Sequence, residues 1–167
     1  MLNQFALAIL LLTTSPVEGL SEQLSGRLVQ VAGYQLKPAE LPKEARYVVF
    51  YYTASWCPNC HAIEEAMIEM KSAFKKADAD IRFVWVSLDY SAAEAARYYA
   101  KSAYRGLAIK PGIKHDKIIG AKDALEAGIP SLRIYEVSSE LWEPAATIPS
   151  TDINAQLKLL QEAIRAP

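Results

Sequence analysis

The sequence contains only two cysteines, and it lacks both a membrane-length apolar run and an excess of charge of either sign. Eighteen Lys and Arg residues stand against 19 Asp and Glu. No long-range field therefore favours nucleic acid or an anionic membrane surface. The apolar run FALAILLL at residues 5–12 is much shorter than the roughly 20 apolar residues that cross a bilayer. We therefore expect neither a nucleic-acid-binding nor a membrane-spanning protein.

The absence of a third cysteine excludes a disulfide framework. Cys57 and Cys60 lie in the segment SWCPNCH, and a bond between them would enclose only two residues. Such a small loop restrains the unfolded chain little, so a purely structural disulfide is a poor explanation. A zinc site would need about four ligands. It would have to combine the cysteines with the adjacent His61 and with the distant His115, and two cysteines with an adjacent histidine rarely converge on one ion. We therefore expect no metal and no cofactor.

A serine hydrolase is also disfavoured, because the sequence has no nucleophile-elbow motif. These exclusions leave a redox pair as the leading interpretation of the two cysteines.

The N-terminal residues have the pattern of an export signal. The run at residues 5–12 has the length of a signal-peptide apolar core, and Val17 and Gly19 are small enough for cleavage after Gly19. The preceding MLNQ has no Lys or Arg, unlike a typical signal, and a buried N-terminal element is the alternative. We expect residues 1–19 to be a signal peptide and residues 20–167 to form one domain. The mature protein is expected to be exported to a periplasm, without stable membrane insertion.

The order of apolar patterns indicates an α/β domain. Continuous apolar runs at residues 47–52 and 81–89 predict strands covered on both faces, and a third strand is expected at residues 129–137. Helical spacing follows the first two strands, at residues 58–77 and 91–103. Ser91 is the expected N-cap of the second helix, with Glu94 three residues on completing a capping box. This alternation predicts a central sheet with helices on both faces.

The remaining segments are less regular. The stretches RLVQV and YQL, on either side of Ala32 and Gly33, predict a short N-terminal β-hairpin. Residues 104–111 are expected to be irregular, and residues 114–128 to form a shorter helix that ends at Gly128. Residues 138–150 indicate a turn, and residues 151–166 are expected to form the last helix.

The two cysteines lie at the carboxyl end of the first buried strand, where open α/β sheets place their sites. Cys57 is expected at the N-cap of the next helix, with Pro58 in its first position. Free amides and the helix dipole there stabilise a thiolate. Cys60 lies one turn further on, less exposed but within reach. Cys57 would attack a substrate disulfide and Cys60 would resolve the mixed disulfide, while Pro58 and Asn59 help to set the reduction potential.

The segment GIPSL puts Pro130 at the start of a predicted central strand, where a proline lacks the usual N–H donor. Two interpretations remain open. Either Ile129–Pro130 is a cis peptide bond in a tight turn, or Pro130 is a trans proline at the strand entrance.

These blocks together resemble the thioredoxin superfamily, in particular its nucleoredoxin and tryparedoxin-like branch. The resemblance covers residues 46–136 and rests on VVFYYTASWCPNC, FVWVSLD, ARYYAKSAYRGLAI and GIPSLRIYE. It implies a thioredoxin fold with a central mixed sheet, with Cys57 as nucleophile and Cys60 as resolving cysteine. It further implies that Pro130 is a cis-proline beside the disulfide, that the Ile129 backbone pairs with an extended substrate, and that Trp56 flanks the site.

The sequence departs from this family at three positions. Asn59 stands where the branch usually has proline or glycine, His61 where it usually has Arg or Lys, and Tyr51 where thioredoxins proper carry a buried acid. Tryparedoxin-like proteins also lack that acid, so Tyr51 favours this branch. His61 either supplies positive charge to the thiolate at mildly acid pH or is a helix-surface residue without a special role, and the second is favoured. The export pattern suggests a bacterial relative.

We therefore predict a thiol–disulfide oxidoreductase that acts on protein thiols and disulfides and exchanges electrons with an upstream redox partner. A reductant is favoured, because the most similar branch works in that direction. A protein disulfide oxidant is one alternative. A thioredoxin-fold binding module without turnover is the other, and it would show no cysteine-dependent reduction of insulin.

Overall fold

The computed structural model describes residues 19–76, 80–138, 144–148 and 155. The expected signal peptide, apart from Gly19, and the expected last helix, apart from Ala155, lie outside these residues. No helix among the described residues is both long enough and apolar enough to cross a membrane.

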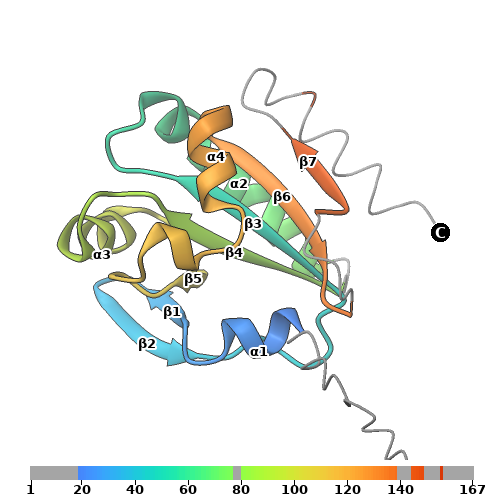
Figure 1. The fold of residues 1–167 in the computed structure, drawn as a ribbon. Helices are drawn as coiled ribbons and strands as arrows, with labels where there is room; N and C mark the ends of the chain where they lie inside the picture. The colour runs from blue at the N-terminus through green and yellow to red at the C-terminus, as the bar shows by residue number, and fades with distance from the viewer. Residues whose placement is uncertain (1–18, 77–79, 139–143, 149–154, 156–167) are drawn as a thin grey trace, which may run out of the picture.

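The described residues form a mixed seven-stranded sheet with the strand order β2-β1-β5-β4-β3-β6-β7 (Figure 1). β3 pairs with β4 in parallel and β4 with β5 in parallel, whereas the other neighbouring strands are antiparallel. The strands are β1 (Leu28–Ala32), β2 (Gln35–Ala39), β3 (Tyr47–Thr53), β4 (Ile81–Ser87), β5 (Gly106–Ile109), β6 (Ser131–Glu136) and β7 (Ala146–Ile148).

Helices cover both faces of the sheet, as predicted. α2 (Pro58–Lys76) and α3 (Ala92–Lys101) pack on the face that carries Val49 and Tyr51 of β3. The short helices α1 (Leu20–Leu24) and α4 (Ala121–Ala127) pack on the opposite face. Both faces of β3 are therefore buried, because successive side chains of a strand point to opposite sides. The continuous apolar run of this strand had indicated this environment.

Local signals predicted several elements correctly. The hairpin forms from β1 and β2, with β2 at the edge of the sheet. Ser91 caps α3: its hydroxyl oxygen accepts the Glu94 N–H at 3.2 Å, and the same hydroxyl donates to the Glu94 carboxylate at 3.0 Å. The first bond is the N-cap bond expected from the sequence. The second differs from a capping box, in which the carboxylate accepts the main-chain N–H of the N-cap residue and not its hydroxyl.

Three expectations were wrong. Part of the segment expected to be irregular is β5, which lies between β1 and β4. A segment of four residues shows too little alternation to identify a strand. β5 is held by backbone pairing with β1 and β4, which lie far from it in the sequence. The single helix expected at residues 114–128 is a 3₁₀ turn, η1 (His115–Lys117), followed by α4, because the backbone turns at Gly120 with φ +68°. β7 pairs with β6 in a segment that had indicated only a turn.

Candidate active site

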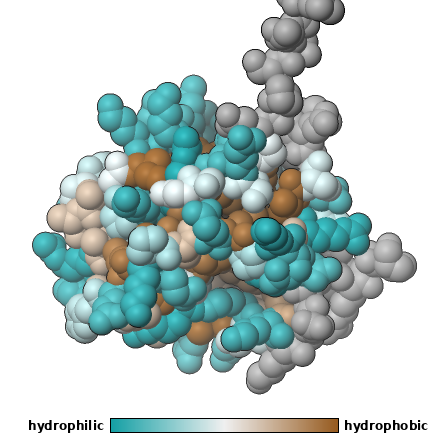
Figure 2. All heavy atoms as spheres, turned by 90° about the horizontal axis from the view of Figure 1, so that it is seen from below, coloured by the Kyte–Doolittle hydropathy of each residue, from teal (hydrophilic) through white to brown (hydrophobic). Residues whose placement is uncertain are grey.

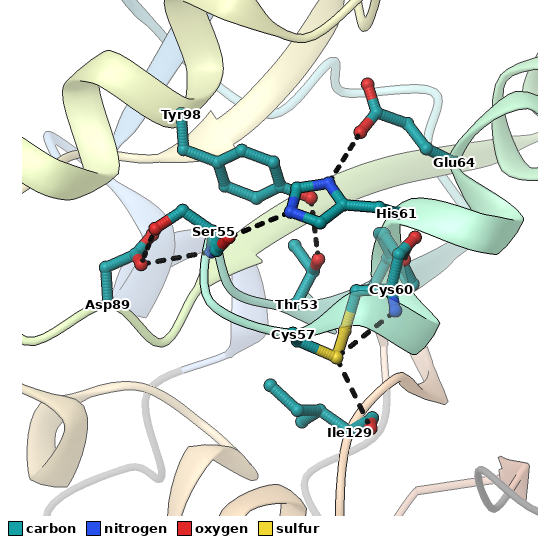
Figure 3. Close-up of a disulfide and its surroundings, with 10 residues drawn as sticks. Thr53, Ser55, Cys57, Cys60, His61, Glu64, Asp89, Tyr98 and Ile129 are labelled. Atoms are coloured by element: carbon teal, nitrogen blue, oxygen red, sulfur yellow. Dashed lines mark hydrogen bonds and ion pairs between the residues drawn. A yellow bond between two sulfur atoms is a disulfide. The ribbon is translucent and has the colours of Figure 1, made fainter.

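The two cysteines lie where β3 passes into α2, and they form a disulfide (Figure 3). The Cys57 carbonyl accepts the His61 N–H at 3.3 Å, and Pro58 is the first helical residue. Cys57 is thus the N-cap of α2, as predicted. Its sulfur also accepts the Cys60 N–H at 3.2 Å. The same N–H also donates to the Cys57 carbonyl at 3.1 Å. A main-chain amide at the start of a helix therefore points at the Cys57 sulfur, where it would stabilise a thiolate.

The two sulfurs differ in access. Cys57 is 5% exposed, whereas Cys60 is fully buried. Cys60 is less exposed than Cys57, as expected, although both are buried. Pro58 and Asn59, between them, are exposed on the first turn of α2. Of the two cysteines, only Cys57 has a solvent-accessible surface that a substrate could approach.

The segment before β6 lies against the Cys57 sulfur. The Ile129–Pro130 peptide bond is cis, which decides between the two interpretations of Pro130. The Ile129 carbonyl oxygen lies 3.6 Å from the Cys57 sulfur. In the disulfide this is a contact without a hydrogen, and only the reduced thiol can donate to that oxygen. Because Ser131 is in register with Tyr52, the pairing of β6 with β3 brings this segment to the redox pair.

Asp89 anchors the loop in front of Cys57, a role that the sequence did not reveal. Its buried carboxylate accepts the Ser55 N–H at 3.0 Å and the Ser55 hydroxyl at 2.6 Å (Figure 3). It also accepts the Ser87 hydroxyl at 2.6 Å. Hydrogen bonds to a charged acceptor are stronger than neutral ones. The sequence feature that could have indicated this role is an acidic residue just beyond the end of β4, a buried strand that pairs in parallel with β3.

Trp56 flanks Cys57 in the sequence and is 44% exposed. Its ring stacks on Tyr90 with centroids 5.8 Å apart and an interplanar angle of 16°. Tyr90 follows Asp89 and is 82% exposed. The loop after β4 therefore adds a second aromatic ring beside the site, which the sequence patterns had not indicated.

His61 contacts the loop and not the sulfur. Its Nε2 lies 2.8 Å from the Ser55 carbonyl oxygen, its Nδ1 lies 3.9 Å from the Glu64 carboxylate, and its ring meets the edge of Tyr98 (Figure 3). None of these contacts involves Cys57. The geometry therefore gives no support to a charge-supplying role for His61, the interpretation already disfavoured.

Tyr51 occupies the position of the missing acid. Its hydroxyl donates to the Cys60 carbonyl at 3.2 Å, and burial raises the pKa of this phenol far above its usual range. The hydroxyl remains protonated at neutral pH, so Tyr51 cannot take a proton from Cys60 as a carboxylate would. Among the described residues, no group of three or more His, Cys, Asp or Glu side chains is arranged to hold a metal ion.

Comparisons with known proteins agree with this geometry. A family model described as thioredoxin-like matches residues 45–116. Thioredoxin H2 from Arabidopsis thaliana is 31% identical over 103 residues, which cover 61% of this chain and 74% of the relative. Nucleoredoxin from Mus musculus is 23% identical over 156 residues, which cover 80% of this chain. The chain spans 34% of the length of that nucleoredoxin.

A solved structure extends the match to the fold. Tryparedoxin II from C. fasciculata aligns with a TM-score of 0.62 and 26% identity, covering 86% of this chain and 88% of the other. The mixed sheet, the disulfide at the start of α2 and these relatives lead to one conclusion. This chain belongs to the thioredoxin-like family.

Proposed function

We propose that the protein is a thiol–disulfide oxidoreductase in which Cys57 attacks and Cys60 resolves. The observation that carries the proposal is the Cys57–Cys60 disulfide at the N-terminus of α2, with a main-chain amide on the outer sulfur. Family membership supports the same chemistry. Of the two cysteines only Cys57 keeps some exposed surface, and Cys60 is fully buried, which suits a two-step exchange.

In the reducing direction, the Cys57 thiolate attacks one sulfur of a substrate disulfide, and the other substrate sulfur leaves as a thiolate. The Cys60 thiol loses its proton and attacks the Cys57 sulfur of the mixed disulfide, which releases the second substrate thiolate. Two electrons pass to the substrate, two protons complete its thiols, and the Cys57–Cys60 disulfide remains. An upstream dithiol reductant then restores the pair.

The surroundings of Cys57 support a protein substrate. Trp56 and Tyr90 offer exposed aromatic surface on the loop side, and the segment at Ile129 and Pro130 lies against the sulfur on the other side. We propose that an extended substrate segment lies between them and pairs with the Ile129 backbone. Pro58 and Asn59, exposed on the first turn, would contribute to the reduction potential.

The roles of the two cysteines can be tested by trapping. Cys60→Ser should accumulate mixed disulfides with protein partners, because the first step remains and the second is lost. Cys57→Ser should accumulate none and should not reduce insulin in the presence of dithiothreitol. Non-reducing electrophoresis followed by mass spectrometry measures both. If mixed disulfides accumulated with Cys57→Ser and not with Cys60→Ser, the roles of the two cysteines would be reversed. If a variant with both cysteines replaced by serine still accelerated insulin reduction, turnover would not depend on the cysteines.

The direction of electron flow is proposed to be reducing. Reduction potentials of thioredoxin-fold proteins extend from about −270 mV for thioredoxin to about −120 mV for a strong oxidant. Equilibration of the purified protein with glutathione buffers would measure the potential. A value near the lower end supports the reductase, and one near the upper end would make the protein a disulfide donor.

We further propose that residues 1–19 are an export signal and that the protein acts in a periplasm. The support is the apolar run at residues 5–12 with small residues before position 20. Cell fractionation and the mass of the purified protein test this. A mature N-terminus at Leu20 in the periplasmic fraction is expected, and an uncleaved cytosolic protein would contradict it.

A further inference from the structure

A groove of about 590 Å³ lies far from the redox pair, beside the C-terminal half of α2. The end of β2 and the first residues of β4 and β5 form its other walls. Lys71 stands 13 residues after the first residue of α2, which corresponds to roughly 20 Å along a helix. The groove is therefore separate from the site at Cys57.

Basic side chains dominate this groove. Lys71 and Lys75 line it from α2, Arg82 from β4 and Arg105 from the segment before β5, against the single acid Glu40. With four basic side chains against one acid, charge complementarity would govern what this groove binds more than apolar burial. The face of the molecule seen from below Figure 1 is mostly hydrophilic, with apolar residues in separate patches (Figure 2).

Lys71 carries its charge without a counter-ion. Its side chain is half-buried, its Nζ lies 4.8 Å from the centre of the Tyr104 ring, and no carboxylate within the described parts of the chain pairs with it. Lys75 follows one helical turn later, and like charges at this spacing repel each other. Burial and then the Lys75 charge lower the pKa of Lys71. A bound anion would relieve both unfavourable effects.

The nearby acids are engaged elsewhere. The Glu40 carboxylate accepts the Gly26 N–H at 3.2 Å, and Glu44 forms an ion pair with Arg82 at 2.9 Å. Arg105 donates through Nη1 to the carbonyls of Ser102 and Tyr104, at 2.9 and 2.6 Å. These two bonds hold its guanidinium in place. They leave Nη2 and Nε without a hydrogen bond to any residue that the structure describes, so these donors are free for a ligand.

Gly106 keeps the floor of the groove open. A Cβ at this position would lie 2.8 Å from the Lys71 Nζ and 2.6 Å from the Tyr104 hydroxyl oxygen. Any side chain here would displace the Lys71 ammonium from its position over Tyr104. The absence of a side chain at Gly106 therefore leaves room for the Lys71 ammonium in the groove.

We propose that this groove binds a small multivalent anion, held by Lys71, Lys75 and Arg105. The two ammonium groups supply compact charges and the guanidinium supplies oriented donors, a combination suited to phosphate or carboxylate oxygens. Inorganic pyrophosphate and citrate share this chemistry and serve as probes that separate a phosphate ligand from a carboxylate ligand. The site does not depend on the redox chemistry of the cysteines.

Isothermal titration of the oxidised full chain at low ionic strength tests the proposal. Pyrophosphate or citrate should bind with one site per chain. Lys71→Gln and Lys75→Gln should each weaken binding by roughly tenfold, since each removes one charge-assisted hydrogen bond. Lys122→Gln removes a charge on the distant helix α4, whose lysine is exposed and pairs with Glu126, and it should leave the affinity unchanged.

The outcomes separate clearly. Binding of either probe that falls in both groove variants and not in the control supports the site, and the stronger probe identifies its ligand class. Lack of binding of both probes at millimolar concentration overturns it. Equal losses in all three variants would also overturn it, because they would indicate only the general field of the protein. Lys75 is exposed, so Lys75→Gln keeps the test decisive if Lys71→Gln fails to fold.

Discussion

The anchoring of the Cys57 loop by Asp89 leads to a quantitative prediction for Asp89→Ala. The substitution removes the acceptor of three hydrogen bonds, two from Ser55 and one from Ser87. Bonds to a charged group contribute about 1.5–3 kcal/mol each. Ser55 is exposed, so water can replace part of the loss there, whereas Ser87 is 8% exposed. We therefore expect a net loss of about 2–4 kcal/mol in the free energy of unfolding.

The same substitution should lower turnover more than a general loss of stability would. Without the anchor, the Ser55 end of the loop is no longer tied to the end of β4, and the Cys57 sulfur loses its fixed position. Misplacement of a reacting group by about 1 Å can cost on the order of a hundredfold in rate. We expect the rate of dithiothreitol-driven insulin reduction to fall by roughly tenfold to hundredfold. Urea unfolding measures the stability of the same samples.

Asp116→Ala is the matched control. Asp116 lies in η1 and its side chain is 67% exposed. Among the residues that the structure describes, its ion pair is with the neighbouring Lys117 alone. This variant should keep both stability and turnover. Asp89→Asn retains one acceptor oxygen and should lie between Asp89→Ala and the parent. If Asp89→Ala reduced insulin at the parental rate at a temperature where both proteins are folded, anchoring by Asp89 would have no part in the reaction.

Two further predictions concern the buried tyrosines. Tyr51→Phe should lower the free energy of unfolding by about 1 kcal/mol, because it removes one buried hydrogen bond. It should leave the pH profile of turnover unchanged, and a shifted profile would show that the phenol takes part in proton transfer. Burial raises the pKa of several phenols far above 10: Tyr51, Tyr52, Tyr99 and Tyr104. In the unfolded chain these phenols ionise near pH 10, whereas in the folded chain they stay protonated at higher pH. Their contribution to the free energy of unfolding is therefore fully present below pH 10 and is lost as the pH rises above it. Each contributes about 1.4 kcal/mol per pH unit, roughly 5–6 kcal/mol per unit together. Urea midpoints between pH 8 and 11 measure this, and a flat profile would refute it.

The Trp85 ring contacts two of these buried tyrosines in the core. Its ring stacks on Tyr104 with centroids 4.1 Å apart and meets Tyr51 edge-on at 5.1 Å. Tyr51 in turn reaches the Cys60 carbonyl. The aromatic interior of the α2 face therefore extends from the basic groove at Lys71 to the redox pair. The hydrogen bond from the Tyr51 hydroxyl to the Cys60 carbonyl joins this aromatic interior to the first turn of α2.

The sequence by itself determined the elements whose signals are local. The apolar run of β3, Cys57 before Pro58, and Ser91 as the N-cap of α3 each act within a few residues, so their structures could be predicted. The resemblance of the ordered sequence blocks to the thioredoxin superfamily implied the fold. Pro130 was recognised as unusual, because a proline at a strand entrance lacks a donor wherever that strand lies.

The tertiary structure alone decided the features that join distant segments. β5 is too short to identify by its pattern, and it is a strand because β1 and β4 lie on either side of it. Asp89 reaches Ser55 only because β3 and β4 are parallel and end side by side. His61 turned toward the Ser55 carbonyl, a direction that helical spacing does not specify. The β5 ladders and the Asp89 contact join residues far apart in the chain, which local sequence patterns do not describe. The His61 contact spans only six residues, and it depends on the path of the loop between Ser55 and the start of α2.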